Sequence, residues 1–174
     1  MQQSAFVMDV AERGQQFQEL LERHRGILFK VAHTYTRDAH DIADLVQEIA
    51  VQAWRAFARY DGVRPFSTWL YRIALNVAIS FRRSGGHHEQ HLVPFDAQLH
   101  DVATTDAKES DDRVRGLYRC IDALDPLNRA LLLLYLEERS YREIADILGL
   151  SETNVATKLG RLKLRIRNDM SEEI

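Results

Sequence analysis

The stretch Ser140-Tyr-Arg-Glu-Ile-Ala-Asp-Ile-Leu-Gly149-Leu-Ser151 contains, in order, the start of one helix, its end and the start of the next. Ser140 and Glu143 have the spacing of a capping box, which predicts a helix that begins at Tyr141. Gly149 favours the left-handed conformation that ends helices, and Ser151 can cap a second helix directly afterwards. Two short helices joined by a tight turn with a glycine are the geometry of a helix-turn-helix.

The second of these helices, predicted at 152–168, separates an apolar stripe from a polar face. At about 100° per residue, Val155, Leu159, Leu162 and Ile166 share one side, which we expect to be core. The opposite side carries hydroxyl, amide and basic groups, which can reach base edges and phosphates in a major groove. These candidate DNA-binding residues are Thr153, Asn154, Thr157, Lys158, Arg161 and Arg165. A solvated basic helix would look similar, but the capped helix upstream favours DNA binding.

Charge is unevenly distributed along the chain. The 174 residues carry a net charge of −3, and their 45% hydrophobic content is enough for packed cores. Six arginines between positions 55 and 83 accompany a single acidic residue, Asp61, whereas 85–112 holds seven acidic residues and one basic residue, Lys108. The chain therefore has a basic segment, then an acidic segment, and then the basic helix predicted at 152–168. This order predicts two nucleic-acid-facing surfaces joined by an acidic segment.

Helical periodicity recurs almost everywhere outside 84–112, and no sustained alternation indicates a strand. We therefore expect an all-α fold of two small helical domains. The segment after Arg83 begins Ser-Gly-Gly and is acidic, as a flexible linker would be. The expected parts are a three-helix domain at 1–84, a linker at 85–112 and a helix-turn-helix domain at 113–174. The expected helices are at about 12–35, 39–59, 66–83, 113–123, 126–138, 141–148 and 152–168.

Several function classes are disfavoured by composition. The chain has a single cysteine, Cys120, which excludes an internal disulfide. We expect its thiol to be a small buried core group. The linker histidines have no cysteine among them and irregular carboxylate spacing, so we expect no metal site, no metal hydrolase and no cofactor. They are His87, His88, His91 and His100. The N-terminus lacks signal-peptide features and no apolar stretch is long enough for a membrane span, so we expect a cytoplasmic protein without membrane insertion.

Two predicted helices of the N-terminal part each present a polar face. On 39–59, an apolar stripe that includes Leu45 and Ile49 leaves Asp44, Gln47 and Glu48 on the reverse side, where a merely solvated face is the simpler alternative. On 66–83, Phe66, Trp69, Leu70, Ile73, Val77 and Phe81 form the expected core stripe. Basic and amide groups beside aromatic rings are what single-stranded DNA recognition needs. The candidates are Arg72 and Asn76, with Arg64 and Ser67 in the loop 61–67.

Apolar side chains are also expected on outward faces. Helical periodicity places Leu75 and Ile79, together with Tyr71, on the outer side of 66–83, and Leu164 on the outer side of 152–168. Such residues on two DNA-facing helices predict either a closed domain-on-domain form or a partner helix in a shared groove.

Four motifs in this order and spacing resemble the bacterial extracytoplasmic-function (ECF) sigma factors of the sigma-70 family. They are Asp-Leu-Val-Gln-Glu at 44–48, Phe-Ser-Thr-Trp-Leu-Tyr-Arg-Ile-Ala-x-Asn-x-Ala at 66–78, Leu-Asp-Pro-x-x-Arg at 124–129 and Ser-Tyr-Arg-Glu-Ile-Ala-x-x-Leu-Gly at 140–149. The resemblance covers about 17–168. It implies sigma region two, a shortened region-three connector and region four, in a promoter-specificity subunit with no chemistry of its own.

The resemblance also implies partners. Asp44, Gln47 and Glu48 match positions that dock on the β′ clamp helices of RNA polymerase core, whose β flap is a second contact. Arg72, Asn76 and the loop 61–67 match positions at the −10 element, and the helix 152–168 would read the −35 element. An anti-sigma factor, often membrane-tethered, is a further expected partner. Ala156 and Gly160 depart from the pattern, which commonly has a lysine and a larger polar residue there. The alternative function is a stand-alone helix-turn-helix regulator.

Overall fold

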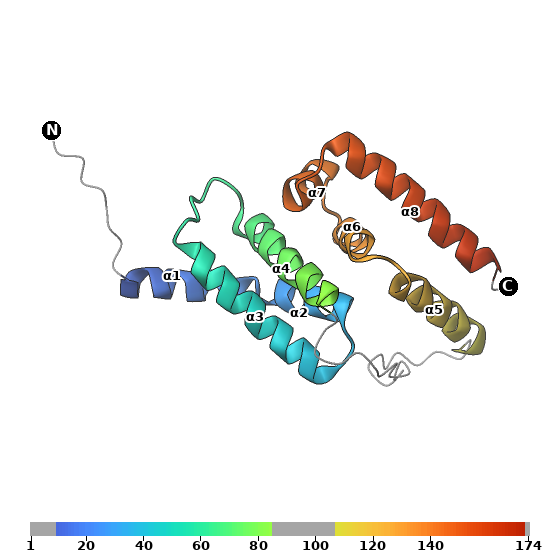
Figure 1. Ribbon diagram of the computed structural model, residues 1–174, viewed down its shortest axis with the longest axis horizontal. Helices are drawn as coiled ribbons and strands as arrows, with labels where there is room; N and C mark the ends of the chain where they lie inside the picture. Colours follow the sequence, from blue (N-terminus) through green and yellow to red (C-terminus); the bar gives the residue numbers. More distant parts are fainter. Residues whose placement is uncertain (1–9, 85–106, 173–174) are drawn as a thin grey trace.

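The computed structural model describes residues 10–84 and 107–172, and within these ranges every regular element is an α-helix. The eight helices described are α1 (Val10–Arg23), α2 (Arg25–Tyr35), α3 (Ala39–Phe57), α4 (Phe66–Arg83), α5 (Ala107–Asp122), α6 (Pro126–Leu136), α7 (Tyr141–Leu148) and α8 (Glu152–Glu172). Figure 1 shows α1–α4 grouped as an N-terminal domain and α5–α8 as a C-terminal domain beside it. The all-α prediction is confirmed. None of the helices in the described ranges is long and apolar enough to cross a bilayer.

Side-chain caps set the helix starts, as the sequence predicted. Asp125 accepts hydrogen bonds from the backbone N–H groups of Leu127 and Asn128, ahead of Pro126 at the first helical position. Ser140 and Glu143 form the reciprocal capping box, with each side chain accepting the other residue's backbone N–H. The structure also has a cap at Asp38, whose carboxylate accepts from two N–H groups at the start of α3.

Helix boundaries differ most from the prediction at two places. The expected helix at 12–35 is broken at His24 into α1 and α2, and Gly26 lowers helix propensity beside the break. The two pieces meet different neighbours. Phe17 of α1 packs on Phe57 at the end of α3, whereas α2 packs along both α3 and α4. The helix expected at 113–123 begins earlier, at Ala107.

The N-terminal domain is built around α4, which lies against α2 and α3. Leu45 and Ile49 of α3 and Leu70 of α4 are buried as predicted, and Ala53 and Ala74 are buried in the same core. An aromatic cluster closes the end of this domain where α3 leads into α4. Its rings, with neighbouring centroids 5–6 Å apart, are Phe57, Tyr60, Phe66 and Trp69. The cluster anchors both ends of the loop 61–65.

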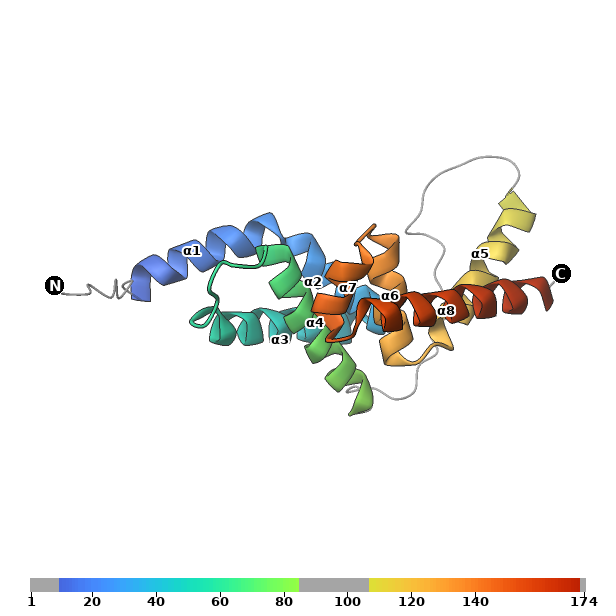
Figure 2. The ribbon, with the colours of Figure 1, turned by 90° about the horizontal axis from the view of Figure 1, so that it is seen from above.

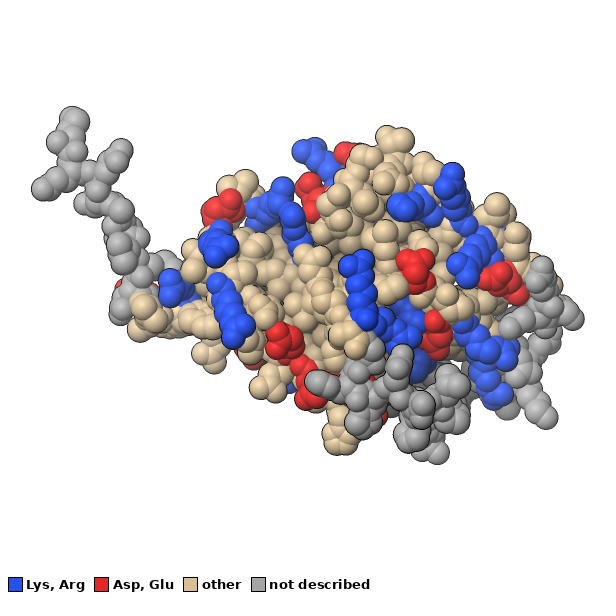
Figure 3. Space-filling view, viewed as in Figure 1, with Lys and Arg blue, Asp and Glu red and all other residues tan. Residues whose placement is uncertain are grey.

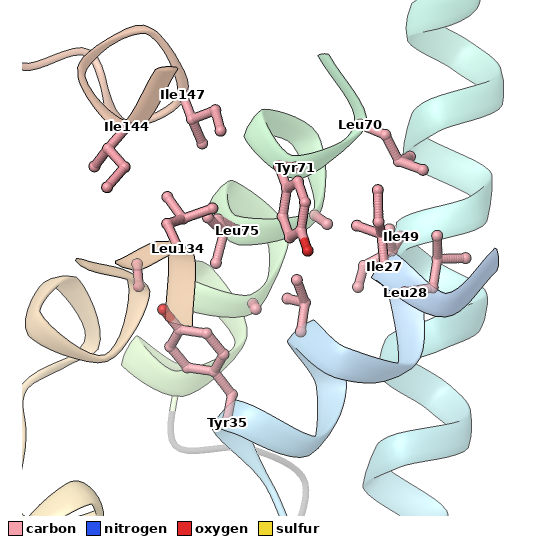
Figure 4. Close-up of a cluster of buried hydrophobic side chains, with 14 of the residues drawn as sticks. Ile27, Leu28, Tyr35, Ile49, Leu70, Tyr71, Leu75, Leu134, Ile144 and Ile147 are labelled. Atoms are coloured by element: carbon pink, nitrogen blue, oxygen red, sulfur yellow. The ribbon is translucent and has the colours of Figure 1, made fainter. Parts of the chain in front are cut away.

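The expectation that Leu75 and Ile79 face outward is wrong. Leu75 is 1% exposed, Tyr71 is equally buried, and Ile79 is partly buried against the same core. The reason is that the C-terminal domain packs on this side of α4, through α6 and α7. In Figure 4, Leu75 points toward Leu134 of α6, with Ile144 and Ile147 of α7 beyond it. Leu164 of α8, by contrast, is exposed as predicted, at 56%.

A buried arginine ties the C-terminal domain to the N-terminal one. Arg129 of α6 donates hydrogen bonds to the carbonyl oxygens of Asp122 and Leu124 and, across the domain boundary, to that of Thr34 at 3.2 Å. All three acceptors lie at or near helix C-terminal ends, where a cation is favoured. Burial, with the nearby positive charge of Arg82, lowers the pKa of the guanidinium. Its hydrogen bonds to three carbonyls offset much of this desolvation.

Candidate nucleic-acid and protein interfaces

The turn between α7 and α8 orients the proposed DNA-reading helix. Gly149 has φ 68° and ψ 35°, the left-handed conformation predicted for it, and its N–H bonds the carbonyl of Ala145. The Ser151 hydroxyl accepts the backbone N–H of Asn154 at 3.1 Å and caps α8. Val155, Leu159 and Leu162 are buried, so one side of α8 packs against the core and the opposite side faces solvent.

The outward side of α8 carries the residues that the sequence singled out. Thr153, Asn154, Thr157, Arg161 and Arg165 are exposed, and Lys158 is half-buried. Two of these have local partners: the Thr157 hydroxyl donates to the Thr153 carbonyl at 2.9 Å, and Arg165 lies 3.7 Å from the Asp169 carboxylate. Figure 3 shows Lys and Arg side chains following the C-terminal domain along the edge where α8 runs.

Gly160, one of the two departures from the family pattern, lies on this outward side. A Cβ built there would meet no atom within 4 Å, so nothing in the described protein requires a glycine at this position.

The loop before α4 is held in a defined conformation. The Asp61 carboxylate accepts the backbone N–H of Val63 at 3.0 Å, and the Tyr60 hydroxyl donates to the carbonyl of Arg64 at 2.8 Å. Gly62 has φ 73°, a conformation that favours glycine. Val63 at the loop tip is 83% exposed. Sequence reasoning included Val63 in the loop 61–67 but did not single it out, although an apolar residue after a turn glycine was the available signal.

Two of the candidate −10 residues lie in or beside this loop, and two lie further along α4. Arg64 is exposed, Ser67 is half-buried at the start of α4, and Arg72 and Asn76 are exposed one turn apart on the same face of the helix. The structure therefore presents Arg72 and Asn76 together. Their neighbour Tyr71, which the sequence grouped with them, is instead buried beneath the C-terminal domain.

The predicted polymerase-docking residues lie on the exposed face of α3. Asp44, Gln47 and Glu48 are all exposed, and the Glu48 carboxylate accepts a hydrogen bond from the Gln52 amide at 2.6 Å. Asp44 and Glu48 are four residues apart, so their carboxylates lie on one side of the helix.

A groove between α3 and α4 brings two predicted sites together. Its volume is about 650 Å³, and its walls include Glu48 and Gln52 from α3 and Asn76 and Ser80 from α4. Ile73, Val77 and Phe81 provide its apolar surface, which explains why these three members of the predicted core stripe are only partly buried. Sequence analysis treated the docking face and the −10 face separately. In the fold, Glu48 and Asn76 line one groove.

Metal ligation receives no support from the described part of the chain. Among residues 10–84 and 107–172, no three His, Cys, Asp or Glu side chains come together as a metal site would require. The linker residues His87, His88, His91 and His100 lie outside the described ranges. Cys120 is buried, as expected of a core thiol.

Comparison with known proteins matches both halves of the chain. The family model for sigma-70 region 2 matches residues 20–87, and that for sigma-70 region 4 matches residues 115–166. The ECF RNA polymerase sigma-E factor of Haemophilus influenzae is 32% identical over 165 residues, covering 87% of this chain and 86% of the relative. The sigma-E factor of Escherichia coli is 29% identical, covering 80% of each chain.

A solved structure has the same fold. CnrH, determined in complex with the cytosolic domain of CnrY, superposes with a TM-score of 0.65 at 26% identity and covers 92% of this chain and 91% of its own. Two family models in the expected order, and a relative of 32% identity that spans most of both chains, show that the chain belongs to the ECF sigma factors of the sigma-70 family.

Proposed function

We propose that this sigma factor recruits RNA polymerase core through α3, holds the melted −10 strand with α4 and reads the −35 element with α8. The observation that carries the proposal is the pairing, in one chain, of a capped helix-turn-helix with an acidic α3 face beside an arginine and amide face on α4. A regulator that used only its helix-turn-helix would leave that second pair of faces unexplained. We assign sigma region two to 1–84, the connector to 85–112 and region four to 113–174, and α5, which begins at Ala107, extends the last part into the connector.

At the −35 element, α8 is the recognition helix. Its buried side docks on α6 and α7, so the exposed side can enter a major groove. Arg161 and Asn154 are the side chains chemically suited to base edges, because guanidinium and amide groups make paired hydrogen bonds to G and A. Arg165 and Lys158 suit phosphates, as does Thr153 near the helix N-terminus. Thr157 presents its methyl group, since its hydroxyl bonds the helix backbone.

At the −10 element, Arg72 and Asn76 contact the unpaired strand, and the loop with Arg64 and Ser67 receives a flipped base. The loop's own hydrogen bonds support this role, because a preformed loop loses less conformational entropy when it binds. Trp69 and Phe66 belong to the aromatic cluster that supports the loop, and they do not contact DNA in this proposal.

Docking to polymerase uses Asp44, Gln47 and Glu48 on α3, facing the basic clamp helices of β′, while the C-terminal domain meets the β flap. Carboxylates opposite basic helices accelerate association and select the correct partner. The chain itself performs no chemistry and takes no cofactor. Polymerase carries out nucleotidyl transfer, and the sigma factor supplies promoter specificity and traps unpaired bases.

An anti-sigma factor regulates the chain in the cytoplasm, and a membrane-tethered regulator would hold it at the membrane without insertion of the chain itself. The similarity to CnrH, solved with the cytosolic domain of CnrY, supports a partner of this class.

Binding to core polymerase tests the proposal against the alternative of a stand-alone regulator. The purified chain should co-migrate with core polymerase on gel filtration and compete with another sigma factor for it. A chain that binds duplex DNA in a sequence-specific manner but never associates with core polymerase would establish the alternative.

A further inference from the structure

The loop 61–65 exposes an apolar side chain to which the proposed function gives no role. Val63 is 83% exposed, more than any other large hydrophobic residue in the described ranges. Figures 1 and 2 agree in placing this loop at the end of the N-terminal domain that lies away from the C-terminal domain. Packing between the domains therefore does not cover it, in contrast to Leu75 of α4.

Backbone contacts on both sides of Val63 fix the direction of its side chain. Its N–H donates to the Asp61 carboxylate at 3.0 Å, and the carbonyl of the next residue, Arg64, accepts from the Tyr60 hydroxyl at 2.8 Å. Tyr60 is held in turn by Phe57, with the two rings stacked at a centroid distance of 5.8 Å. Valine is β-branched and has one stiff side-chain torsion, so a fixed backbone also fixes where its two methyl groups point.

The surroundings of Val63 are cationic. Arg59, just after α3, and Arg64 are both exposed, and the carboxylate of the one acidic residue in the loop, Asp61, accepts the Val63 N–H. Figure 3 shows Lys and Arg side chains gathered over the ends of α3 and α4 that this loop joins.

This combination suits a nucleic acid better than a protein partner. Protein-binding surfaces present a contiguous apolar patch, whereas Val63 is a single apolar group among polar ones. Arginine side chains hold phosphates and position a strand, and an apolar side chain held between them can enter a base stack.

We propose that Val63 is a wedge that enters the base stack at the −10 element and fills the place of the base that the loop receives. The inference rests on the proposed role of this loop with Arg64 and Ser67. It adds a residue that keeps the neighbouring bases apart after one base has left the stack, and it assigns Tyr60 as the residue that positions this wedge.

The size of the valine side chain fits the gap that an extruded base leaves. Stacked bases are about 3.4 Å apart, so extrusion of one base leaves about 6.8 Å between its two neighbours. An aliphatic carbon in contact with both neighbours needs about 3.5–4.0 Å on each side. The isopropyl group therefore fits with only slight widening of the gap. Its contacts replace part of the stacking that is lost when the base is extruded, which favours the melted state.

Opening kinetics test the wedge with variants of matched shape. Val63→Thr keeps the β-branched shape but replaces a methyl group by a hydroxyl, and it should slow open-complex formation roughly tenfold because burial of an apolar group is lost. Val63→Ile keeps an apolar wedge and should open DNA at close to the wild-type rate. Val10→Thr makes the same chemical change at an exposed valine of α1 and should have no effect. Permanganate reactivity of unpaired thymines over time, with core polymerase on a promoter recovered by transcription, measures the rate.

A double-mutant cycle tests the positioning role of Tyr60. Tyr60→Phe keeps the ring on Phe57 and removes only the hydroxyl that holds the Arg64 carbonyl, so it should slow opening several-fold in the wild-type chain. In the Val63→Thr background it should have little further effect, because the side chain through which it acts has already been replaced. A purely structural role for Tyr60 would slow opening by the same factor in both backgrounds and would overturn the positioning assignment.

A photocrosslink locates the side chain in the open complex. An aliphatic diazirine amino acid in place of Val63 should crosslink to the nontemplate strand at adjacent bases of the −10 element. The same amino acid in place of Val10 should not crosslink to this element. Crosslinks from position 63 that are confined to a polymerase subunit would identify the loop tip as a protein contact and overturn the inference.

Failure of the wedge and failure of the proposed function give different results. If the wild-type chain opens the promoter and Val63→Thr opens it equally fast, the wedge is refuted and the proposed function stands. If the wild-type chain neither binds core polymerase nor opens any promoter, the proposed function is refuted and the wedge with it.

Discussion

Glu137 and Lys30, 107 residues apart in the sequence, form a 2.6 Å ion pair that joins the end of α6 to α2. The Lys30 side chain is 50% exposed and that of Glu137 27%, and pairs of this kind contribute only about 0–1 kcal/mol. The pair therefore sets the register of the domain contact more than its strength. Most of the stabilisation of the domain contact comes from burial of Leu75 and its apolar neighbours.

The docking face on α3 can be tested by charge reversal. We expect Asp44→Lys combined with Glu48→Lys to weaken core polymerase binding by roughly tenfold or more, mainly through slower association, because basic clamp helices would meet lysines. Titration of core polymerase with the labelled chain at low and high salt measures the effect, and circular dichroism checks that helicity is retained. Glu19→Lys with Glu22→Lys makes the same charge change on α1 as a control. Wild-type affinity in the α3 variant would refute this assignment.

Arg161 is the best candidate on α8 for a base-specific contact. Arg161→Ala should cost about 1–3 kcal/mol of binding and relax sequence preference at one position of the −35 element. Selection from duplexes randomised across that element measures both. Arg167→Ala, one or two turns further along the helix, should weaken all sequences alike if it affects binding at all. An unchanged sequence profile for Arg161→Ala would mean that this face of α8 has been misassigned.

The face of α4 that carries Arg72 and Asn76 should act after the two promoter DNA strands separate. Arg72→Ala with Asn76→Ala should impair open-complex formation more than initial duplex binding, because the unpaired bases they contact exist only after melting. Permanganate reactivity of unpaired thymines measures opening, and a pre-melted bubble template should rescue transcription. Arg83→Ala removes a charge from the end of the same helix for comparison. Equal loss in both steps, without rescue by the bubble, would contradict the assignment.

The capping box of α7 predicts a pH-dependent contribution to stability. Hydrogen bonds from the Ser140 backbone N–H and hydroxyl hold the pKa of Glu143 below its ordinary value. The stabilisation is therefore present above that ordinary value and is lost as pH falls through the lowered pKa.

Replacement of Ser140 separates the contribution of its hydroxyl from that of the Glu143 carboxylate. Ser140→Ala should reduce the free energy of unfolding by about 1 kcal/mol at neutral pH. Urea denaturation at a pH below the lowered pKa of Glu143 should show a smaller difference, because Glu143 is then protonated in both proteins. Ser151→Ala removes a cap that has no carboxylate partner and should cost the same at both pH values. A Ser140→Ala effect that does not depend on pH would contradict the role of Glu143.

The local features of the fold could be predicted from the sequence, because each depends on residues a few positions apart. Asp125, Ser140 and Gly149 cap or end helices through contacts within one turn. The break at His24 could not be predicted, since it depends on which neighbours α1 and α2 meet. Periodicity also placed Tyr71 and Leu75 on a shared face of α4 correctly.

The sequence could not predict which elements pack on the Tyr71 and Leu75 face of α4. Leu75 is buried and points toward Leu134, about sixty positions later, and a helical period describes which residues share a side but not what packs there. The shared groove of Glu48 and Asn76 was missed for the same reason, because it arises only when α3 and α4 lie side by side. The exposure of the candidate contact residues on α8 was predictable, since the caps and the apolar stripe orient that helix.

Run-off transcription tests the central claim most directly. Core polymerase, the purified chain and a library of genomic fragments should yield transcripts from a small set of start sites that core polymerase alone does not use. Aligned upstream sequences should share two conserved elements near −35 and −10. Transcripts that do not depend on the chain, or a shared sequence at one element alone, would contradict the account.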